Sequence, residues 1–438
     1  MESCTNRQQT IILINDQPLT IFLKRNYLSL MIILISTIVI IAPFISFRSL
    51  ITFQPNETQI ILHPFDVTKD IIQDVDYAIV IDGGSTGTRI HIFSFLINNG
   101  VKQQKIILHD ESYFYIKPGL SSYAHNISQA ATSLEPLLTQ AFKHVPTSLM
   151  PQTPLILKAT AGLRLLPDES ANQILDTVEY RLKSSPFKVQ HDAVSMLDDR
   201  DEGLFGWYTV NFLLNRLHNI SQSAATLDLG GGSTQVTFST NDMNTLVMSP
   251  PGRIAKHQIE GEPEYIYTHS YLGNGLMSAR YSILLEHSHG QQSVEKPGLI
   301  GNRLYSSSNS YDPFEDCYEQ VANFVIESRI DQPKELAHRE VYAMSYFYDR
   351  MKDIRVLKHE QGYIKVRDYF RYAEHICNGM IKFKKQSPFL CLDLTYIASY
   401  LHDGLGLPLH KDILLVKKMN GIEISWALGA AINLFNLN

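Results

Sequence analysis

Two short glycine-rich segments of this chain are near copies of each other. Residues 82–86 read DGGST and residues 228–234 read DLGGGST, each between two apolar runs. This pattern is typical of a strand, a tight turn and a second strand. Glycines let backbone N–H groups approach an anion, Ser and Thr hydroxyls add donors, and an Asp at the end of the first strand can hold a cation. Two such loops facing each other would form a clamp for a chain of phosphates.

A third segment, KATAGLRLLP at residues 158–167, contains a strand end, a small-residue turn and the start of a short helix. The N-terminal N–H groups of that helix and the Thr160 hydroxyl could face an anion. Arg164 in the same segment fits a structural ion pair as well as it fits a ligand contact.

An acidic segment, DDRDEG at residues 198–203, precedes an apolar helical pattern. The helix dipole alone favours acidic residues at a helix start, and this is the simpler interpretation of Asp198 and Asp201. In a phosphate cleft, one of these carboxylates could instead accept a proton from an attacking water. The chain has no Walker GxxxxGK[ST] loop, and the GxSxG match at residues 83–87 lies between two expected strands and not at a strand-to-helix elbow. No side-chain nucleophile is therefore strongly indicated. Cleavage of phosphate by water needs only in-line positioning, a base and charge neutralisation.

The bulk composition indicates a globular protein. The chain has 438 residues, 44% of them hydrophobic, and a net charge of −6. This length predicts two domains after the N-terminal segment, and the acidic balance argues against a nucleic-acid partner. The Cys and His residues show no metal-binding spacing of the CxxC or HExxH type.

Residues 27–47 carry no charge and are dominated by Ile and Leu. A helix of this length, at about 1.5 Å per residue, spans the roughly 30 Å of a bilayer core. Lys24 and Arg25 precede the stretch, which predicts a cytoplasmic N-terminus. The alternative is a cleaved signal peptide, but the stretch is long for one and no cleavage site is obvious. We therefore expect a single-pass type II membrane protein, with residues 1–26 as cytoplasmic tail, 27–47 as signal anchor and 48–75 as stem.

The rest of the chain would then be lumenal, in the Golgi or endoplasmic reticulum, or extracellular. Three N-x-[ST] triplets beyond the anchor agree with this and predict glycosylation at Asn56, Asn126 and Asn219. Cys4 falls on the cytoplasmic side. Cys377 and Cys391 are close enough in sequence to close a small disulfide loop, with Cys317 remaining as a thiol. The alternative is that all three are buried thiols.

The hydrophobic pattern from Asp76 onwards predicts an α/β fold. We expect strands over 77–81, 90–95, 105–115 and 155–159, and helices over 127–142, 170–184, 315–328, 366–377, 394–401 and 425–435. Residues 240–261 and 287–313 are expected to be loop-rich because Pro, Gly, Ser and Asn cluster there.

With these residues in view, the chain resembles the ectonucleoside triphosphate diphosphohydrolases, the apyrase family, over roughly residues 76–437. Seven motifs occur in the family's order: IVIDGGSTGTRIHIF (79–93), KPGLSSY (117–123), KATAGLRLLP (158–167), DEGLFGWYTVNFL (201–213), LDLGGGSTQVTF (227–238), YAMSYFYDR (342–350) and SWALGAAINL (425–434). The short length and few cysteines are most similar to the compact secretory-pathway members, which often favour diphosphates such as UDP and GDP.

The resemblance implies an α/β fold of two ribonuclease-H-like, actin/sugar-kinase-like domains with a cleft between them. Residues 76–200 plus 417–438 would form the first domain and 201–416 the second. It also implies metal-assisted hydrolysis of nucleoside di- and triphosphates with Ca²⁺ or Mg²⁺.

The resemblance assigns roles by position. Glu202 matches the general base, Ser233 and Gln235 match the residues that orient the water, and Asp82 and Asp228 match the carboxylates that hold the metal largely through its waters. The phosphate loops correspond to Ser85, Thr86, Gly87, Thr88, Gly231 and Gly232, with Thr160 beside them. Tyr346 and Trp426 match the rings that stack on the nucleobase, whereas from their sequence context alone both would be interpreted as core aromatics.

The chain departs from the family pattern at two places. The family usually has Gly three residues before the base, where this chain has Asp199. The compact members usually carry a second disulfide, for which Cys317 lacks the expected partner. Two other functions are alternatives: a related-fold kinase that transfers phosphate to an acceptor, and a non-catalytic membrane glycoprotein ectodomain.

Overall fold

The computed structural model of the chain describes residues 74–98, 105–217, 219–259, 262–286, 312–381 and 387–436. The expected cytoplasmic tail, the signal anchor at 27–47, almost all of the stem, Cys4 and Asn56 lie outside these residues. Within the described part of the chain, no helix is both long and apolar enough to cross a bilayer.

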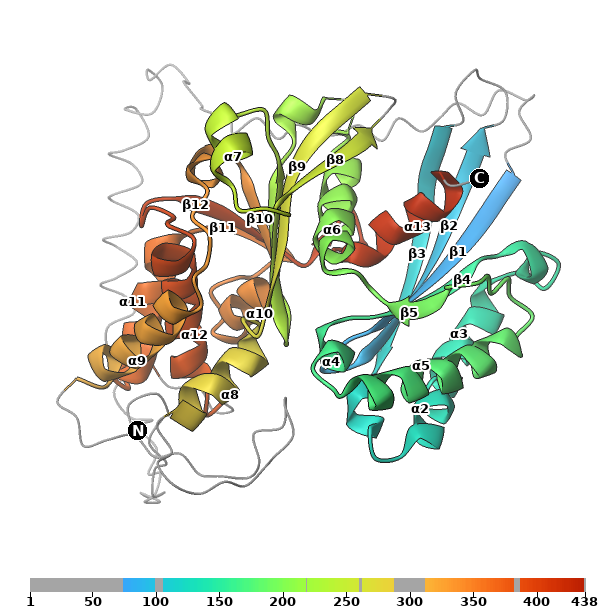
Figure 1. Cartoon of the computed structure of the whole chain (residues 1–438), viewed down its shortest axis with the longest axis horizontal. Coiled ribbons are helices and arrows are strands. Elements are labelled where there is room, and N and C mark those ends of the chain that lie inside the picture. Colours follow the sequence, from blue (N-terminus) through green and yellow to red (C-terminus); the bar gives the residue numbers. More distant parts are fainter. Residues whose placement is uncertain are drawn as a thin grey trace, which may run out of the picture. The chain divides into compact units, whose positions relative to one another are not determined.

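The first sheet carries the first glycine loop at one end of its central hairpin (Figure 1). Its strands are β1 (Asp74–Gly83), β2 (Thr88–Asn98), β3 (Lys105–Ile116), β4 (Leu155–Ala159) and β5 (Val194–Met196), in the order β3-β2-β1-β4-β5. β1 pairs antiparallel with β2 and parallel with β4. The expected strands at 77–81, 90–95, 105–115 and 155–159 are thereby confirmed.

The second sheet repeats this arrangement around the second glycine loop. Its strands are β6 (Ala225–Leu229), β7 (Ser233–Ser239), β8 (Ile254–Ile259), β9 (Glu262–Leu272), β10 (Val341–Ser345), β11 (Gln361–Lys365) and β12 (Asp412–Val416), in the order β11-β12-β10-β6-β7-β9-β8. The stretch β9-β7-β6-β10-β12 matches β3-β2-β1-β4-β5 in order and in strand direction. The repeated loop in the sequence therefore marks a repeated sheet.

Helices cover both sheets. They are α2 (Ile127–Ser133), α3 (Glu135–His144), α4 (Ala161–Arg164), α5 (Asp168–Lys183), α6 (Asp199–Leu213), α7 (Met243–Met248), α8 (Leu276–Glu286), α9 (Pro313–Glu327), α10 (Tyr346–Asp353), α11 (Val366–Cys377), α12 (Leu390–Ser399) and α13 (Trp426–Asn436). α6 and α13 cross each other between the two sheets (Figure 1). The helix expected over residues 425–435 is α13, and it packs against β1 and β2 of the first sheet.

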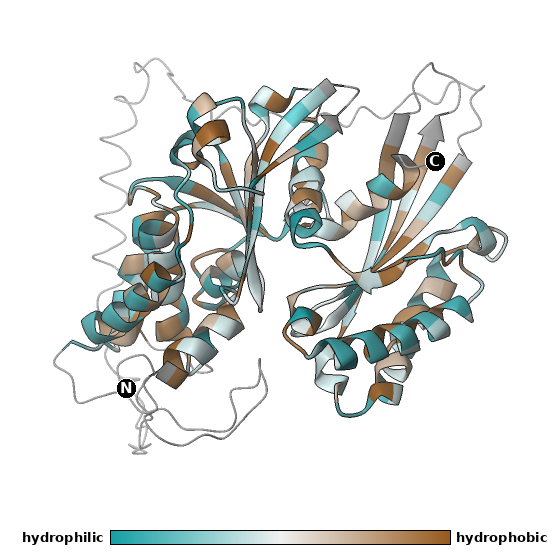
Figure 2. Ribbon diagram, in the orientation of Figure 1, coloured by the Kyte–Doolittle hydropathy of each residue, from teal (hydrophilic) through white to brown (hydrophobic). Residues whose placement is uncertain are grey.

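The side chains of β1 alternate between two cores, as a strand buried on both faces requires. Ile79 and Ile81 pack with α2, α3 and α5, whereas Ala78 and Val80 pack with α13. α5 buries apolar residues spaced three or four apart and exposes polar ones, so its outer face is teal in Figure 2. This packing holds the end of β1, and hence the first glycine loop, on a rigid support.

Some element predictions need correction. The single helix expected over 127–142 is two helices, α2 and α3, separated at Leu134, because Pro136 lies in the first turn of α3 and cannot continue a preceding helix. The expected loop over 240–261 contains α7, whose first turn is capped by Asp242, and the strand β8. Tertiary pairing with β9 overrides the turn-forming residues in that segment.

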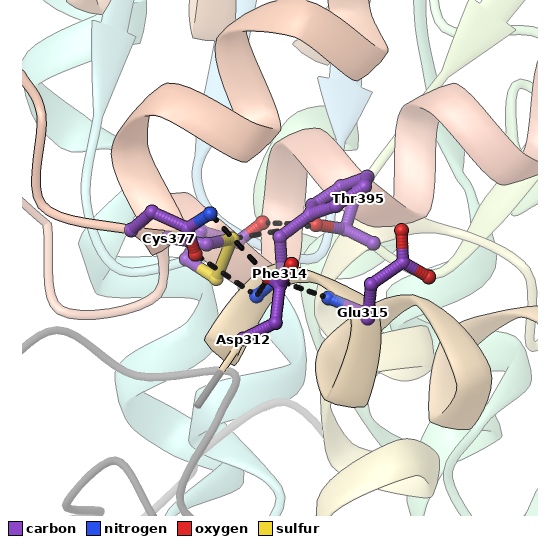
Figure 3. Close-up of a disulfide and its surroundings, with 7 residues drawn as sticks. Asp312, Phe314, Glu315, Cys377 and Thr395 are labelled. Atoms are coloured by element: carbon purple, nitrogen blue, oxygen red, sulfur yellow. Dashed lines mark hydrogen bonds between the residues drawn. A yellow bond between two sulfur atoms is a disulfide. The ribbon is translucent and has the colours of Figure 1, made fainter. Parts of the chain in front are cut away.

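A disulfide joins α11 to α12, as expected for Cys377 and Cys391 (Figure 3). The Cys317 sulfur on α9 lies within 4.8 Å of both bridge sulfurs. Asp312 caps α9 beside the bridge by accepting hydrogen bonds from the backbone N–H groups of Phe314 and Glu315, at 3.1 and 3.3 Å (Figure 3). No cysteine of the described residues is free, so the expectation of a Cys317 thiol is wrong.

Candidate active site

The tips of the two glycine loops touch each other. The loop between β1 and β2 and the loop between β6 and β7 meet where Gly231 packs on the Ser85 hydroxyl, with no room for a Cβ at position 231. A Cβ at Gly232 would lie 2.8 Å from the Ala161 Cβ, so the start of α4 closes the same junction. Three segments far apart in the sequence therefore converge on one point.

The second loop directs its backbone N–H groups away from α8. The carbonyl oxygen of Gly230 accepts from Leu276 N at 2.9 Å, that of Gly231 from Met277 N at 2.9 Å, and that of Gly232 from Gly273 N at 2.8 Å. Since the N–H of a trans peptide points opposite to its C=O, the N–H groups that follow these carbonyls point to the other side. The loop thus has the form of an anion-binding nest.

The first loop is held in a comparable way. The Gly84 and Ser85 carbonyl oxygens lie against Gly119, where a Cβ would overlap them. On the other side, Gly162 of α4 packs on Ser85, and a Cβ there would lie 2.6 Å from the Ser85 Cα. The Ser85 and Thr86 side chains remain partly exposed between these supports.

The other residues expected at the phosphates line the same region. Thr160 directly precedes α4 at its N-cap position, and its N–H donates to the Gly83 carbonyl at 3.3 Å. Gly87 packs on the Ile116 carbonyl, where a Cβ would be 2.8 Å away. The Thr88 hydroxyl is fully buried and, within the described residues, has no hydrogen-bond partner.

Asp82 and Asp228 occupy equivalent places, one residue before the end of β1 and of β6. Arg89, opposite Asp82 on β2, donates from Nη1 to Asp82 Oδ2 at 3.1 Å. Burial raises the pKa of both carboxyl groups, and the negative charge of Asp82 raises that of Asp228 further. The repulsion between these two carboxylates is one that a bound divalent cation would relieve.

One oxygen of each carboxylate supports this interpretation. Oδ1 of Asp82 and Oδ1 of Asp228 are buried and have no hydrogen-bond partner among the described residues. Oxygen donors of this kind are the ligands that Ca²⁺ and Mg²⁺ prefer. The donor set therefore fits a hard divalent cation bound directly or through water.

Glu202 lies in the first turn of α6 and is 9% exposed. Its Oε2 accepts a hydrogen bond from Arg164 Nη2, and the same guanidinium donates from Nη1 to Asp199. Burial raises the pKa of Glu202 to about 8; Arg164 opposes the shift and the charges of Asp228 and Asp82 add to it. A carboxyl group with a pKa near neutrality is suited to accept a proton in catalysis.

Two further side chains beside the second loop form a small polar network. Gln235 Nε2 donates to the Ser233 hydroxyl at 2.8 Å and to the Ser270 hydroxyl at 2.9 Å. All three residues are buried. Because Ser233 accepts from Gln235, its own hydroxyl proton is available to a molecule in the junction.

The two expected base-stacking rings lie in different settings. Tyr346 is partly exposed at the start of α10, and the Arg350 guanidinium lies 5.2 Å from its ring centroid. Trp426 is only 4% exposed, packs in the core between the sheets, and hydrogen-bonds Asp82 through its side chain, which opposes the burial effect on the Asp82 pKa. A stacking role for Trp426 stays a prediction that would require its ring to become exposed.

Sequence reasoning missed several residues of this site. The ion pair of Arg89, the support of Gln235 by Ser270, and the hydrogen bond from Ser345 that lowers the Asp228 pKa were not anticipated. Arg89 had a usable signal, because a hairpin register places it directly opposite Asp82. The expected glycosylation acceptors Asn126 and Asn219 lie outside this site, in front of α2 and of a short 3₁₀ turn.

Comparisons with known proteins find related sequences that cover most of the chain. Ectonucleoside triphosphate diphosphohydrolase 5 of Ailuropoda melanoleuca is 40% identical over 380 residues, which cover 82% of this chain and 87% of that protein. Nucleoside diphosphate phosphatase ENTPD5 of Homo sapiens is 39% identical over 82% of this chain and 87% of that protein. Ectonucleoside triphosphate diphosphohydrolase 6 of Mus musculus is also 39% identical, over 82% of this chain and 81% of that protein.

A solved structure shares the fold. The nucleoside triphosphate hydrolase of Neospora caninum superimposes with a TM-score of 0.54 at 15% identity, covering 83% of this chain and 93% of that one. The family model described as GDA1/CD39 (nucleoside phosphatase) matches residues 69–298 and 313–438. The chain therefore belongs to the GDA1/CD39 nucleoside phosphatase family.

Proposed function

We propose that this chain hydrolyses the terminal phosphate of nucleoside di- and triphosphates by attack of water, favours diphosphates such as UDP and GDP, and uses Ca²⁺ or Mg²⁺. The single observation that carries the proposal is the junction of the two glycine loops next to a buried carboxylate, Glu202. The names of its relatives, which describe nucleoside di- and triphosphate phosphatases, support the substrate class.

In this proposal the loops bind the phosphates. The N–H groups of Gly231 and Gly232 and the hydroxyls of Ser85 and Thr86 donate to phosphate oxygens, and Thr160 and Thr88 extend the set. Ser233 and Gln235 hold a water in line with the terminal phosphorus, and Glu202 accepts its proton as the P–O bond forms. Tyr346 contacts the nucleobase.

A divalent cation at Asp82 and Asp228 would neutralise the charge that the phosphates carry during the reaction. The unpartnered carboxylate oxygens support this assignment. Arg89 and Trp426 hold Asp82, and Ser345 holds Asp228, so that both carboxylates keep one orientation.

The proposal extends to organisation and location. We assign residues 76–200 plus 417–438 and residues 201–416 to two ribonuclease-H-like domains, in agreement with the repeated strand order. The catalytic part lies in the lumen of the secretory pathway or outside the cell, anchored through residues 27–47, and carries glycans at the N-x-[ST] sites. The Cys377–Cys391 bridge supports an oxidising compartment.

The test is release of inorganic phosphate from UDP, GDP and the matching triphosphates, without an acceptor and with Ca²⁺ or Mg²⁺. Glu202→Gln keeps the shape of the side chain and removes the base, so turnover is expected to fall by about 10²- to 10⁴-fold. Glu179→Gln, on the outer face of α5, is the matched control and should behave as wild type. Phosphate transfer that requires an acceptor would indicate the kinase. No phosphate release from the wild type would indicate the non-catalytic ectodomain. Near-normal turnover by Glu202→Gln would contradict the role of Glu202 as the base.

A further inference from the structure

Asp199 lies one helical turn before Glu202 at the start of α6, on the same side of the helix. Both carboxylates meet the guanidinium of Arg164, which comes from α4 beside the first glycine loop. Nη1 donates to Asp199 Oδ1 and Nη2 to Glu202 Oε2. Arg164 therefore lies as a bridge between a side chain that is half exposed and one that is buried.

The two carboxylates determine where the guanidinium lies. Among the described residues they are its only hydrogen-bond partners, and its remaining nitrogen, Nε, is buried without one. A planar guanidinium held at both ends has little freedom to rotate. If the Asp199 end were released, the group would keep a single contact, the one to Glu202.

A cavity beside Arg164 could accommodate the guanidinium if Asp199 released it. Asp199 and Arg164 form part of the wall of a cavity of about 630 Å³, to which Arg253 and His269 also contribute. Arg253 is held by Asp331 at 2.6 Å, and Arg200 also lines the cavity. Asp199 is positioned to hold Arg164 at the wall, against Glu202, and to prevent the guanidinium from rotating into this open, water-accessible space.

We propose that Asp199 is a positioning residue for the hydrolysis reaction, which holds Arg164 so that the guanidinium fixes Oε2 of Glu202 and leaves Oε1 for the attacking water. This inference rests on the proposed function of Glu202. It gives a role to the carboxylate that stands where the resembled family usually has Gly.

Helix capping does not account for Asp199. The cap of α6 is Asp198, whose side chain accepts from the Arg200 N–H at 2.9 Å. Asp199 instead bonds a residue of another helix. The neighbouring Asp198 is therefore a matched control, because it shares the helix terminus and its charge and lacks the contact to Arg164.

The experiment measures kcat and KM for UDP and GDP in the full chain carrying Asp199→Asn, Asp199→Glu or Asp198→Asn. We expect Asp199→Asn to lower kcat about tenfold with KM within twofold, because orientation of the base affects the reacting state more than substrate binding. Asp199→Glu, which keeps the carboxylate, should recover most of the loss, and Asp198→Asn should match wild type.

A double-mutant cycle with Arg164→Gln separates positioning from a general effect on folding. In the Arg164→Gln background, Asp199→Asn should change kcat by less than twofold, since its effect acts through Arg164. Equal effects in both backgrounds, or a lowered melting temperature with unchanged kcat, would overturn the inference. Glu202→Gln in the same assay distinguishes the two proposals: if it is inactive while Asp199→Asn equals wild type, only the role of Asp199 fails.

Discussion

Gly162 packs directly on Ser85, so that a Cβ at position 162 would lie 2.6 Å from the Ser85 Cα. The contact joins α4 to the tip of the first glycine loop, and the second loop packs on the same serine through Gly231. Any side chain at position 162 must therefore push the first loop toward or away from the phosphates.

We expect Gly162→Ala to reduce kcat/KM by about 10²-fold, because a loop displacement near 1 Å is enough to misplace the bound phosphates. The measurement is steady-state phosphate release, with circular dichroism to show that the fold is retained. Gly206→Ala in α6 is the matched control, since a Cβ there meets nothing within 4 Å. It should keep activity and stabilise the protein by about 0.5–1 kcal/mol. A fully active Gly162→Ala variant would show that the first loop does not grip the substrate.

The metal assignment predicts that activity depends on both Asp82 and Asp228. Asp82→Asn and Asp228→Asn should each raise the Ca²⁺ concentration needed for half-maximal activity by at least tenfold, because each removes a charge from the cation site. Activity should also stop in excess EDTA and return when Ca²⁺ or Mg²⁺ is added. Full turnover in EDTA would exclude the metal role of these two residues.

The same carboxylates make metal binding dependent on pH. Burial raises the pKa of Asp82 and of Asp228, so protons compete with the cation as the pH falls. We expect the apparent Ca²⁺ affinity, measured by titration calorimetry on the wild type, to weaken progressively as the pH is lowered. An affinity that stays constant across the acid range would contradict a site made of these groups.

Much of this site follows from local sequence, and the exceptions have a common cause. The two hairpins and the positions of Asp82 and Asp228 could be predicted because a strand, a glycine turn and a second strand are specified by residues next to each other. The disulfide was also predictable, since Cys377 and Cys391 end and begin adjacent helices.

The partners of Arg164 could not be predicted from sequence. Its segment allowed an ion pair or a ligand contact, and the two carboxylates that it binds lie on α6, which only the tertiary fold brings next to α4. The same limit applies to Trp426: its motif indicates a ring near the nucleotide, but packing of α13 against β1 decides that the ring is buried.

The raised pKa of Glu202 predicts how activity depends on pH. Without a cation the pKa of Glu202 is raised to about 8, and a cation at Asp82 and Asp228 would lower it, so in saturating Ca²⁺ kcat/KM should rise with pH and level off below pH 8. A profile for UDP between pH 5 and 9 in saturating Ca²⁺ measures this rise. A rate independent of pH over that range would contradict a Glu202 that titrates within it.

Stability should depend on the same group in the opposite direction. Glu202 has a folded pKa of about 8 against an ordinary value of 4.5, so its contribution to stability is fully present below pH 4.5 and is lost as the pH rises through about 8. The free energy of unfolding of the metal-free wild type should therefore fall by about 5 kcal/mol relative to that of Glu202→Gln across that window. Urea unfolding of both proteins at several pH values measures the difference, and parallel curves would contradict the shift.

The disulfide between α11 and α12 closes a short loop, with its cysteines 14 residues apart. Cross-linking a loop of about 15 residues removes unfolded-state entropy worth about 3 kcal/mol. We expect the double variant Cys377→Ala/Cys391→Ala to lose a free energy of unfolding of this order, measured by urea denaturation. Its kcat should stay close to wild type, because the bridge lies among α9, α11 and α12 while the glycine loops rest on α4 and α8. A large loss of kcat at full folding would show instead that this helical layer is coupled to the phosphate loops.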